Sequence, residues 1–223
     1  TQAQRDARAQ ALAPLEARRA ELAAQRSAVE EAILARAAAK AAEYESRWSR
    51  PAVSRTGTTE EFAPVEARAV RLVVSGRDKD PNSSTGFKID EFEVWTADGA
   101  RNVALASAGG HADGRSPVAE DFGGAYLPEL TIDGKFGQSW IASAPILTIT
   151  LAQPERISKV LFSSDRLGAL APDSGEAPFP CEYRIEVSAD GQSWTQVADS
   201  SDRKPANDAH RRKRLIDAEI APD

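Results

Sequence analysis

The chain has 223 residues, enough for one globular domain with an extension or for two small domains, which excludes a large multidomain enzyme. Its net charge of −6 argues against nucleic acid as the main partner, because domains that bind a phosphate backbone are generally basic. No stretch of about 20 predominantly apolar residues occurs, so the sequence predicts no membrane span.

Residues 1 to 50 predict one long helix, because this segment is rich in Ala, Arg and Glu and contains no Gly. Its apolar residues recur at steps of three, four or seven and form one stripe: Leu12, Leu15, Leu22, Val29, Ile33, Ala37, Tyr44 and Trp48. Such a stripe needs a partner. Pro14 lacks an amide donor, so we expect a kink there or a helix that starts at about Ala13.

Residues 51 to 66 predict a linker, and residues 67 to 204 predict a single β domain. The hydrophobic period changes to two, as in strands with one buried face, at Val70, Leu72 and Val74, at Leu147, Ile149 and Leu151, and at Tyr183, Ile185 and Val187. Further strands are predicted at residues 87 to 95, 157 to 162 and 194 to 197, with Trp95, Trp140 and Trp194 in the core. This spacing indicates a β-sandwich.

Residues 205 to 223 predict a short returning helix that starts at Pro205 and carries Leu215, Ile216 and Ile220 on its apolar face. We expect it to pair with the first helix as an antiparallel hairpin whose tip carries the β domain. The basic run at residues 211 to 214 spreads around a helix axis, so we interpret it as a solvated face. The chain lacks Met and stops directly after this helix, and we interpret it as a segment of a longer protein.

The residues of the usual catalytic motifs are missing from the sequence. His111 and His210 are the only histidines, and there is no His-Glu-x-x-His pair, Gly-x-Ser-x-Gly elbow or phosphate-binding Gly-rich loop. Cys181 is the only cysteine, so neither an intrachain disulfide nor a thiolate metal cage can form, and we expect a buried, unreactive thiol. We therefore expect a protein that is not an enzyme.

Four segments occur in an order and spacing typical of one family: LPELTIDGKFGQSW at residues 127 to 140, ILTITL at 146 to 151, ISKVLF at 157 to 162 and YRIEVSADGQSW at 183 to 194. Together they resemble the discoidin, or coagulation-factor 5/8 type C, domain, the jelly-roll β-sandwich to which the family 32 carbohydrate-binding modules belong. Two further blocks, ARAVRL at 67 to 72 and EFEVW at 91 to 95, resemble the end of that domain but come first here. The resemblance, which covers residues 67 to about 200, therefore implies a circular permutation, with the two helices attached at the new ends.

The resemblance also implies a structural Ca²⁺ bound by oxygen atoms. Carried over residue by residue, its ligands are the side chains of Asp133, Gln138 and Glu91 and the carbonyls of Leu130, Lys135 and Asp90. Gln138 departs from the family, which has Thr at this place, although Ser139 is adjacent. A plain turn is the alternative to a metal site.

Domains of this family bind their ligands through loops at one end, which here correspond to residues 77 to 87, 109 to 128 and 163 to 181. An aromatic ring there stacks on a sugar while charged and polar groups hydrogen-bond its hydroxyls. The candidate ligand-binding residues are His111, Asp113, Arg115, Tyr126, Asp165, Arg166, Phe179 and Phe87. For the loop around His111, an ordinary polar loop is the alternative.

We therefore expect a noncatalytic carbohydrate-binding module of a larger bacterial protein that is extracellular or periplasmic, with helices available to contact other domains of that protein. A protein-interaction or adhesion domain of the same fold without a sugar site is one alternative. A helical spacer that oligomerises as a coiled coil is another, although Arg19, Arg26 and Lys40 interrupt a strict heptad. Fold alone does not decide between these functions.

Overall fold

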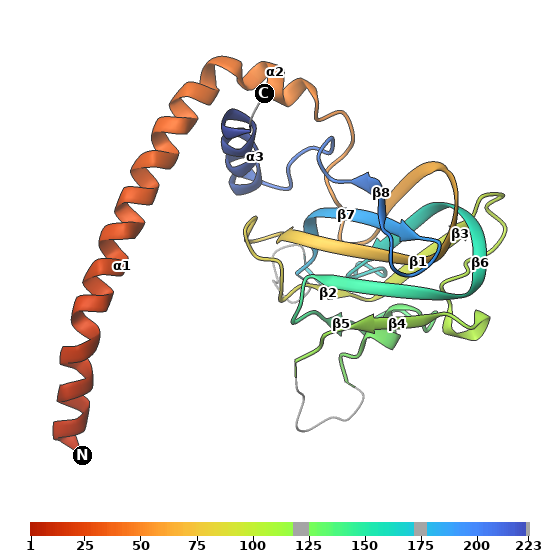
Figure 1. Cartoon of the computed structure of the whole chain (residues 1–223), viewed down its shortest axis with the longest axis horizontal. Coiled ribbons are helices and arrows are strands. Elements are labelled where there is room, and N and C mark those ends of the chain that lie inside the picture. The colour runs from red at the N-terminus through yellow and green to blue at the C-terminus, as the bar shows by residue number, and fades with distance from the viewer. Residues whose placement is uncertain (118–124, 172–177, 222–223) are drawn as a thin grey trace. The chain divides into compact units, whose positions relative to one another are not determined.

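The computed structural model describes residues 1–117, 125–171 and 178–221. Within them, the helices are α1 (Gln2–Ala37), α2 (Ala41–Ser46) and α3 (Asp208–Ile220), and the 3₁₀ turns are η1 (Ala38–Lys40), η2 (Ala106–Ala108) and η3 (Pro128–Thr131). The strands are β1 (Thr58–Arg77), β2 (Lys88–Ile89), β3 (Glu91–Thr96), β4 (His111–Gly114), β5 (Trp140–Ile141), β6 (Ile146–Ser163), β7 (Pro180–Ser188) and β8 (Thr195–Asp199) (Figure 1). The chain divides into a helical unit, Thr1–Arg47 with Arg211–Asp223, and a β unit, Trp48–His210.

Helices occupy most of the two terminal segments in which the sequence predicts them. The expected start near Ala13 is wrong, because Thr1 and Gln4 form a capping box that starts α1 at Gln2, and the helix runs through Pro14. A 3₁₀ turn at Ala38–Lys40 separates α1 from α2. None of the helices in the described ranges is long and apolar enough to cross a lipid bilayer.

Within the helical unit, α3 contacts residues near the α1–α2 junction. Arg212 binds Glu31 at 2.8 Å and Arg211 binds Glu45 at 2.9 Å. Glu219 accepts hydrogen bonds from Lys40 at 3.2 Å and from the Tyr44 hydroxyl at 3.0 Å, while Leu215 and Ala37 are buried. Residues 1 to 29 of the predicted stripe are exposed, so these contacts cover only its C-terminal part.

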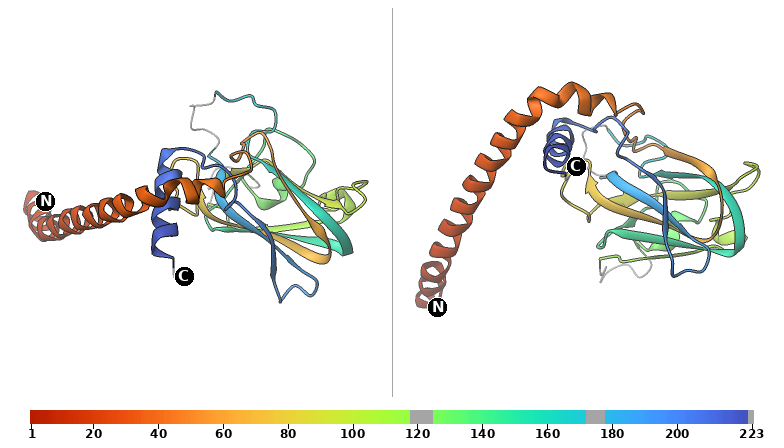
Figure 2. Two further views of the ribbon diagram at one scale, coloured as in Figure 1. Left: turned by 90° about the horizontal axis from the view of Figure 1, so that it is seen from above. Right: turned by 45° about the horizontal axis from the view of Figure 1, so that its top comes forward.

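The β unit is built on two long strands, β1 and β6, which pair antiparallel along most of their length. The first half of β1 pairs with the second half of β6, where β3 joins them. The second half of β1 pairs with the first half of β6, and β4, β7 and β8 extend this region. Irregular pairing near residues 61 to 69 marks the bend between the halves, and both strands curve there (Figures 1 and 2).

The predicted alternation of buried residues is confirmed by the register of the central strands. Val70 pairs with Val187, Leu72 with Ile185, and Val74 with Tyr183. Leu72 and Val70 also face Leu147 and Ile149 of β6, so these side chains form continuous apolar rows across three strands. The segment that starts at Ala67 therefore pairs directly with the strand at Tyr183–Val187.

One hydrophobic core joins the two halves of the sheet. Phe162 from the second half of β6 meets Tyr183 of β7 edge to face, with ring centroids 5.0 Å apart. Phe92 of β3 stacks on Phe162, and Trp140 packs edge to face against Phe87. Cys181 is buried beside this core, as the sequence predicts.

Three further sequence predictions require correction. Residues 58 to 66 belong to β1 rather than to a linker, and the strand was hidden because its inward side chains include Thr58 and Glu60. Trp140 is buried, but Trp95 and Trp194 are half-buried and lie beneath cations: Lys159 is 4.8 Å from the Trp95 ring centroid, and Arg71 is 4.1 Å from that of Trp194.

His210, in the first turn of α3, is fully buried and is the last residue of the β unit. Its Nδ1 lies 2.7 Å from Glu182, and its Nε2 lies 3.0 Å from the carbonyl of Arg77. We expect His210→Ala to lower the free energy of unfolding by about 2 kcal/mol, because two buried hydrogen bonds are lost. The measurement is urea unfolding, with the exposed His111→Ala as the matched control that leaves stability unchanged. Equal stabilities of the two variants would contradict this role for His210.

Candidate functional site

Two adjoining cavities lie at the end of the β unit where β2, the turn before β5 and the segment after β6 meet. Their volumes are about 380 and 430 Å³, within the range of small-molecule sites, and both are lined by Lys88, Gly137 and Ser139. We call this pair the loop-end groove. Its other lining residues are Ala125, Tyr126 and Gln138 in one cavity and Asp90, Ser164, Asp165, Ala169 and Leu170 in the other.

Lys88 occupies the shared wall of the groove because of its place in β2. Phe87 and Ile89 on either side of it are fully buried, and successive side chains of an extended chain point to opposite faces. Lys88 therefore points away from the core. β2 is fixed by pairing with β5 and by a hydrogen bond from the Lys88 amide to the carbonyl of Pro178 at 2.7 Å.

The two carboxylates of the groove are engaged by their own surroundings. Asp165 accepts hydrogen bonds from the amides of Ala169 at 3.0 Å and Leu170 at 3.2 Å, and its carboxylate lies 3.4 Å from Arg55. Asp90 accepts a hydrogen bond from the amide of Arg166 at 2.7 Å. These carboxylates therefore shape the loop after β6.

Of the predicted ligand-binding residues, Tyr126 and Asp165 line the groove. Tyr126 is 43% exposed and has a positive φ of 63°, an uncommon conformation for a bulky residue. Arg166 follows Asp165 in the chain, but its guanidinium binds Glu93 at 2.6 Å and lies 5.7 Å from the ring centroid of the exposed Phe136.

The other predicted ligand-binding residues lie elsewhere. The prediction that Phe87 contacts a ligand is wrong, because its side chain is fully buried against Trp140. Phe179 is half-buried and packs on the core. His111 and Asp113 lie on the outer face of β4, since Ala112 between them points inward, and neither they nor Arg115 line the groove. Residues 118–124 and 172–177 of the predicted binding loops lie outside the described residues.

The predicted metal ligands include one buried carboxylate with an unsatisfied oxygen. Glu91 is 2% exposed, and its Oε2 has no hydrogen-bond partner within the part of the chain that the structure describes. Burial, and then the charges of Glu93, Asp133 and Asp90, raise the pKa of Glu91 from 4.5 to about 8. A divalent cation beside Glu91 would relieve this accumulation of negative charge.

The remaining predicted metal ligands fit such a cation in part. Asp133 is near enough to influence Glu91, and its Oδ1 accepts a hydrogen bond from the amide of Lys135 at 2.8 Å. Leu130 lies in η3, while Gln138 is exposed and lines the loop-end groove. Across the described ranges, no three acidic, histidine or cysteine side chains are grouped closely enough to hold a metal. Backbone carbonyls would therefore have to supply part of the coordination.

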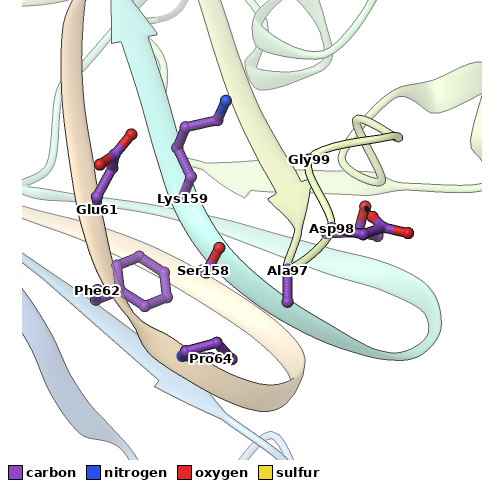
Figure 3. A pocket seen from close by; sticks show the side chains of 9 residues that line it. Glu61, Phe62, Pro64, Ala97, Asp98, Gly99, Ser158 and Lys159 are labelled. Carbon is purple, nitrogen blue, oxygen red and sulfur yellow. Dashed lines mark hydrogen bonds between the residues drawn. The ribbon is translucent and has the colours of Figure 1, made fainter.

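A third cavity, of about 380 Å³, lies beside the bend of β1 and β6 (Figure 3). Glu61 and Phe62 of β1 and Lys159 of β6 line it, with the turn after β3. Asp98 points away from Phe62 in Figure 3 and accepts a hydrogen bond from the amide of Ala100 at 3.1 Å. Because Phe62 partly packs into the core and Lys159 lies over Trp95, we prefer the loop-end groove as the functional site.

Comparisons of the chain with family models, curated proteins and solved structures found no match. The function is therefore inferred from the side chains of the loop end. Sequence reasoning missed Lys88 and Ser139, and it assigned Gln138 to the metal site rather than to the groove. The available signal for Lys88 was its position between Phe87 and Ile89, which indicates a charged side chain on the outer face of a short strand.

Proposed function

We propose that this chain is a noncatalytic carbohydrate-binding module of a larger extracellular or periplasmic protein, and that the loop-end groove binds the glycan. The observation that carries this proposal is the groove itself, in which the exposed Tyr126 adjoins Lys88, Gln138 and Ser139, whose side chains make no hydrogen bond or ion pair with the residues that the structure describes. An aromatic face beside several hydrogen-bonding groups is the arrangement that a sugar ring requires.

The fold we propose is a discoidin-like jelly-roll sandwich with permuted ends. Two features support it: the segment from Ala67 pairs with β6 and β7, and the two halves of the sheet share one core. The ends of the β unit are adjacent, since the Arg50 amide donates to the carbonyl of Asp202 at 3.0 Å and the Lys204 amide donates to that of Arg50 at 2.8 Å. We also propose that the helices form a hairpin in which α3 pairs only with residues 30 to 45.

We also propose a structural Ca²⁺ held by Glu91, Asp133 and carbonyl oxygens, including those of Leu130, Lys135 and Asp90. The orphaned buried oxygen of Glu91 is the observation that supports it. Such a cation would supply charge neutralisation next to the loops.

The glycan proposal is tested by replacing Tyr126, with binding measured by glycan array and then by calorimetry on the best ligand. Asn is the suitable substitute because it tolerates a positive φ. We expect Tyr126→Asn to weaken binding about tenfold through loss of the aromatic contact, with unchanged unfolding. His111→Ala is the control and should bind as the parent chain does. A loss of binding in His111→Ala but not in Tyr126→Asn would move the site to the outer face of β4.

A helical association function is favoured by one separate observation. Leu12, Leu15, Leu22 and Val29 are exposed along one face of α1. Light scattering on the full chain over a range of concentrations tests it. A monomer at all concentrations argues against self-association, and a dimer abolished by Leu22→Glu supports it.

A further inference from the structure

We propose that the loop-end groove selects an anionic saccharide, with the ammonium group of Lys88 binding a carboxylate or a sulfate ester of the ligand. This inference rests on the proposed carbohydrate-binding function and specifies its ligand class. It follows from which charged side chains around the groove already have hydrogen-bond or ion-pair partners in the protein and which do not.

The negative charges of the groove are already committed to protein groups. Asp165 binds two backbone amides and lies beside Arg55. Asp90 accepts from the Arg166 amide and from the Ser163 hydroxyl. Both carboxylates therefore have their oxygens engaged by protein donors, and Asp165 also lies beside a cation.

The ammonium group of Lys88, in contrast, has no such protein partner among the described residues. Among the residues that the structure describes, no acidic side chain lies within ion-pair distance of its ammonium group, and no hydrogen-bond acceptor is paired with it. The nearby Arg166 is neutralised by Glu93, and Arg55 by Asp165. Lys88 is thus the cation that the lining of the groove offers to a ligand, and no acidic residue is among the described residues that line the cavity it shares with Tyr126.

The position of Lys88 makes this charge accessible from both cavities. It lines each of them, and the half-buried residue carries an ammonium group with three donors, none of which is paired among the residues that the structure describes. Gln138 and Ser139 lie beside it and can bind hydroxyl groups, while Tyr126 offers a ring face. A ligand that combines hydroxyls, an apolar ring face and one anionic group matches this set, and an acidic peptide lacks the hydroxyls.

The first experiment exposes the full chain to an array of neutral, carboxylate-bearing and sulfate-bearing glycans, with a Glu-rich peptide spotted alongside. We expect acidic glycans to bind at least about tenfold more tightly than their neutral counterparts, and the two acidic sets identify the anionic group. Equal binding of neutral and acidic glycans would overturn the charge selection and leave carbohydrate binding in place. Binding of the peptide alone, or of no glycan, would overturn the proposed function itself.

The second experiment measures three variants by calorimetry with the best acidic glycan. Lys88→Gln should weaken binding about tenfold and remove most of its salt dependence, and Lys88→Arg should retain both. Lys159→Gln is the matched control, because it removes an equal charge at the third cavity, and it should leave binding unchanged. If Lys88→Gln and Lys159→Gln weaken binding equally, the effect is one of net charge and the assignment to Lys88 is overturned.

Discussion

Replacing Glu60 by Ala is expected to lower the free energy of unfolding by about 3–5 kcal/mol, because the change removes one partner of a buried ion pair. Glu60 is 1% exposed and binds the guanidinium groups of Arg50 and Arg203, the latter at 2.9 Å. It also accepts a hydrogen bond from the hydroxyl of Tyr183. Burial, and then the Glu60 charge, raise the pKa of Tyr183, so that hydroxyl keeps its proton and remains a donor.

Urea unfolding followed by tryptophan fluorescence measures this loss. Glu61→Ala is the matched control, since it removes the same side chain from the next, exposed position of β1 and should change stability by less than about 0.5 kcal/mol. A loss below about 1 kcal/mol in Glu60→Ala would show that the cluster contributes little to the stability of the β unit.

Glu91 is expected to make the metal-free chain less stable as the pH rises from about 4.5 to about 8. Its pKa is about 8 in the folded chain and 4.5 ordinarily, so the folded state binds more protons in this window. The free energy of unfolding should therefore fall by up to about 1.4 kcal/mol per pH unit relative to Glu91→Gln, and the difference should level off above pH 8.

The measurement is the difference in stability between the parent chain and Glu91→Gln, in EDTA, from pH 4 to pH 9. Calcium added at pH 8 should stabilise the parent chain and leave Glu91→Gln unchanged, because the amide cannot replace the charged ligand. Parallel pH curves for the two chains would mean that Glu91 is solvated in solution. If the stability difference depends on pH but calcium has no effect, Glu91 is buried as described and the proposed calcium site is contradicted.

The sequence was most informative where the buried face of a strand is apolar. The alternation at Val70–Val74 and at Tyr183–Val187 predicted two strands that the register confirms. It failed at residues 58 to 66, where Glu60 points inward as part of an ion cluster that includes Arg203, 143 residues further along the chain. It also failed at β4, an edge strand whose His111 and Asp113 resemble loop residues.

Only part of the candidate site could be predicted from the sequence, because some of its features depend on contacts between distant residues. Tyr126 and Asp165 were assigned to the loop end from the resemblance to discoidin domains, and the structure places both in the lining of the groove. The sequence could place Lys88 on the outer face of a short strand, but it could not show that its ammonium group has no acidic partner among the described residues, because that depends on which acidic groups other cations have already neutralised. Those pairings, such as Arg166 with Glu93, join residues far apart in the chain.

The adjacency of the two ends of the β unit has a mechanical consequence. Tension applied through the chain before Arg50 and after Arg203 acts first on the backbone bridge between these residues and on the side chains clasped around it. Tension between Arg50 and Arg203 therefore does not cross the strands. Tension applied beyond His210, in contrast, also reaches β7 and β1 through the contacts of this residue with Glu182 and Arg77.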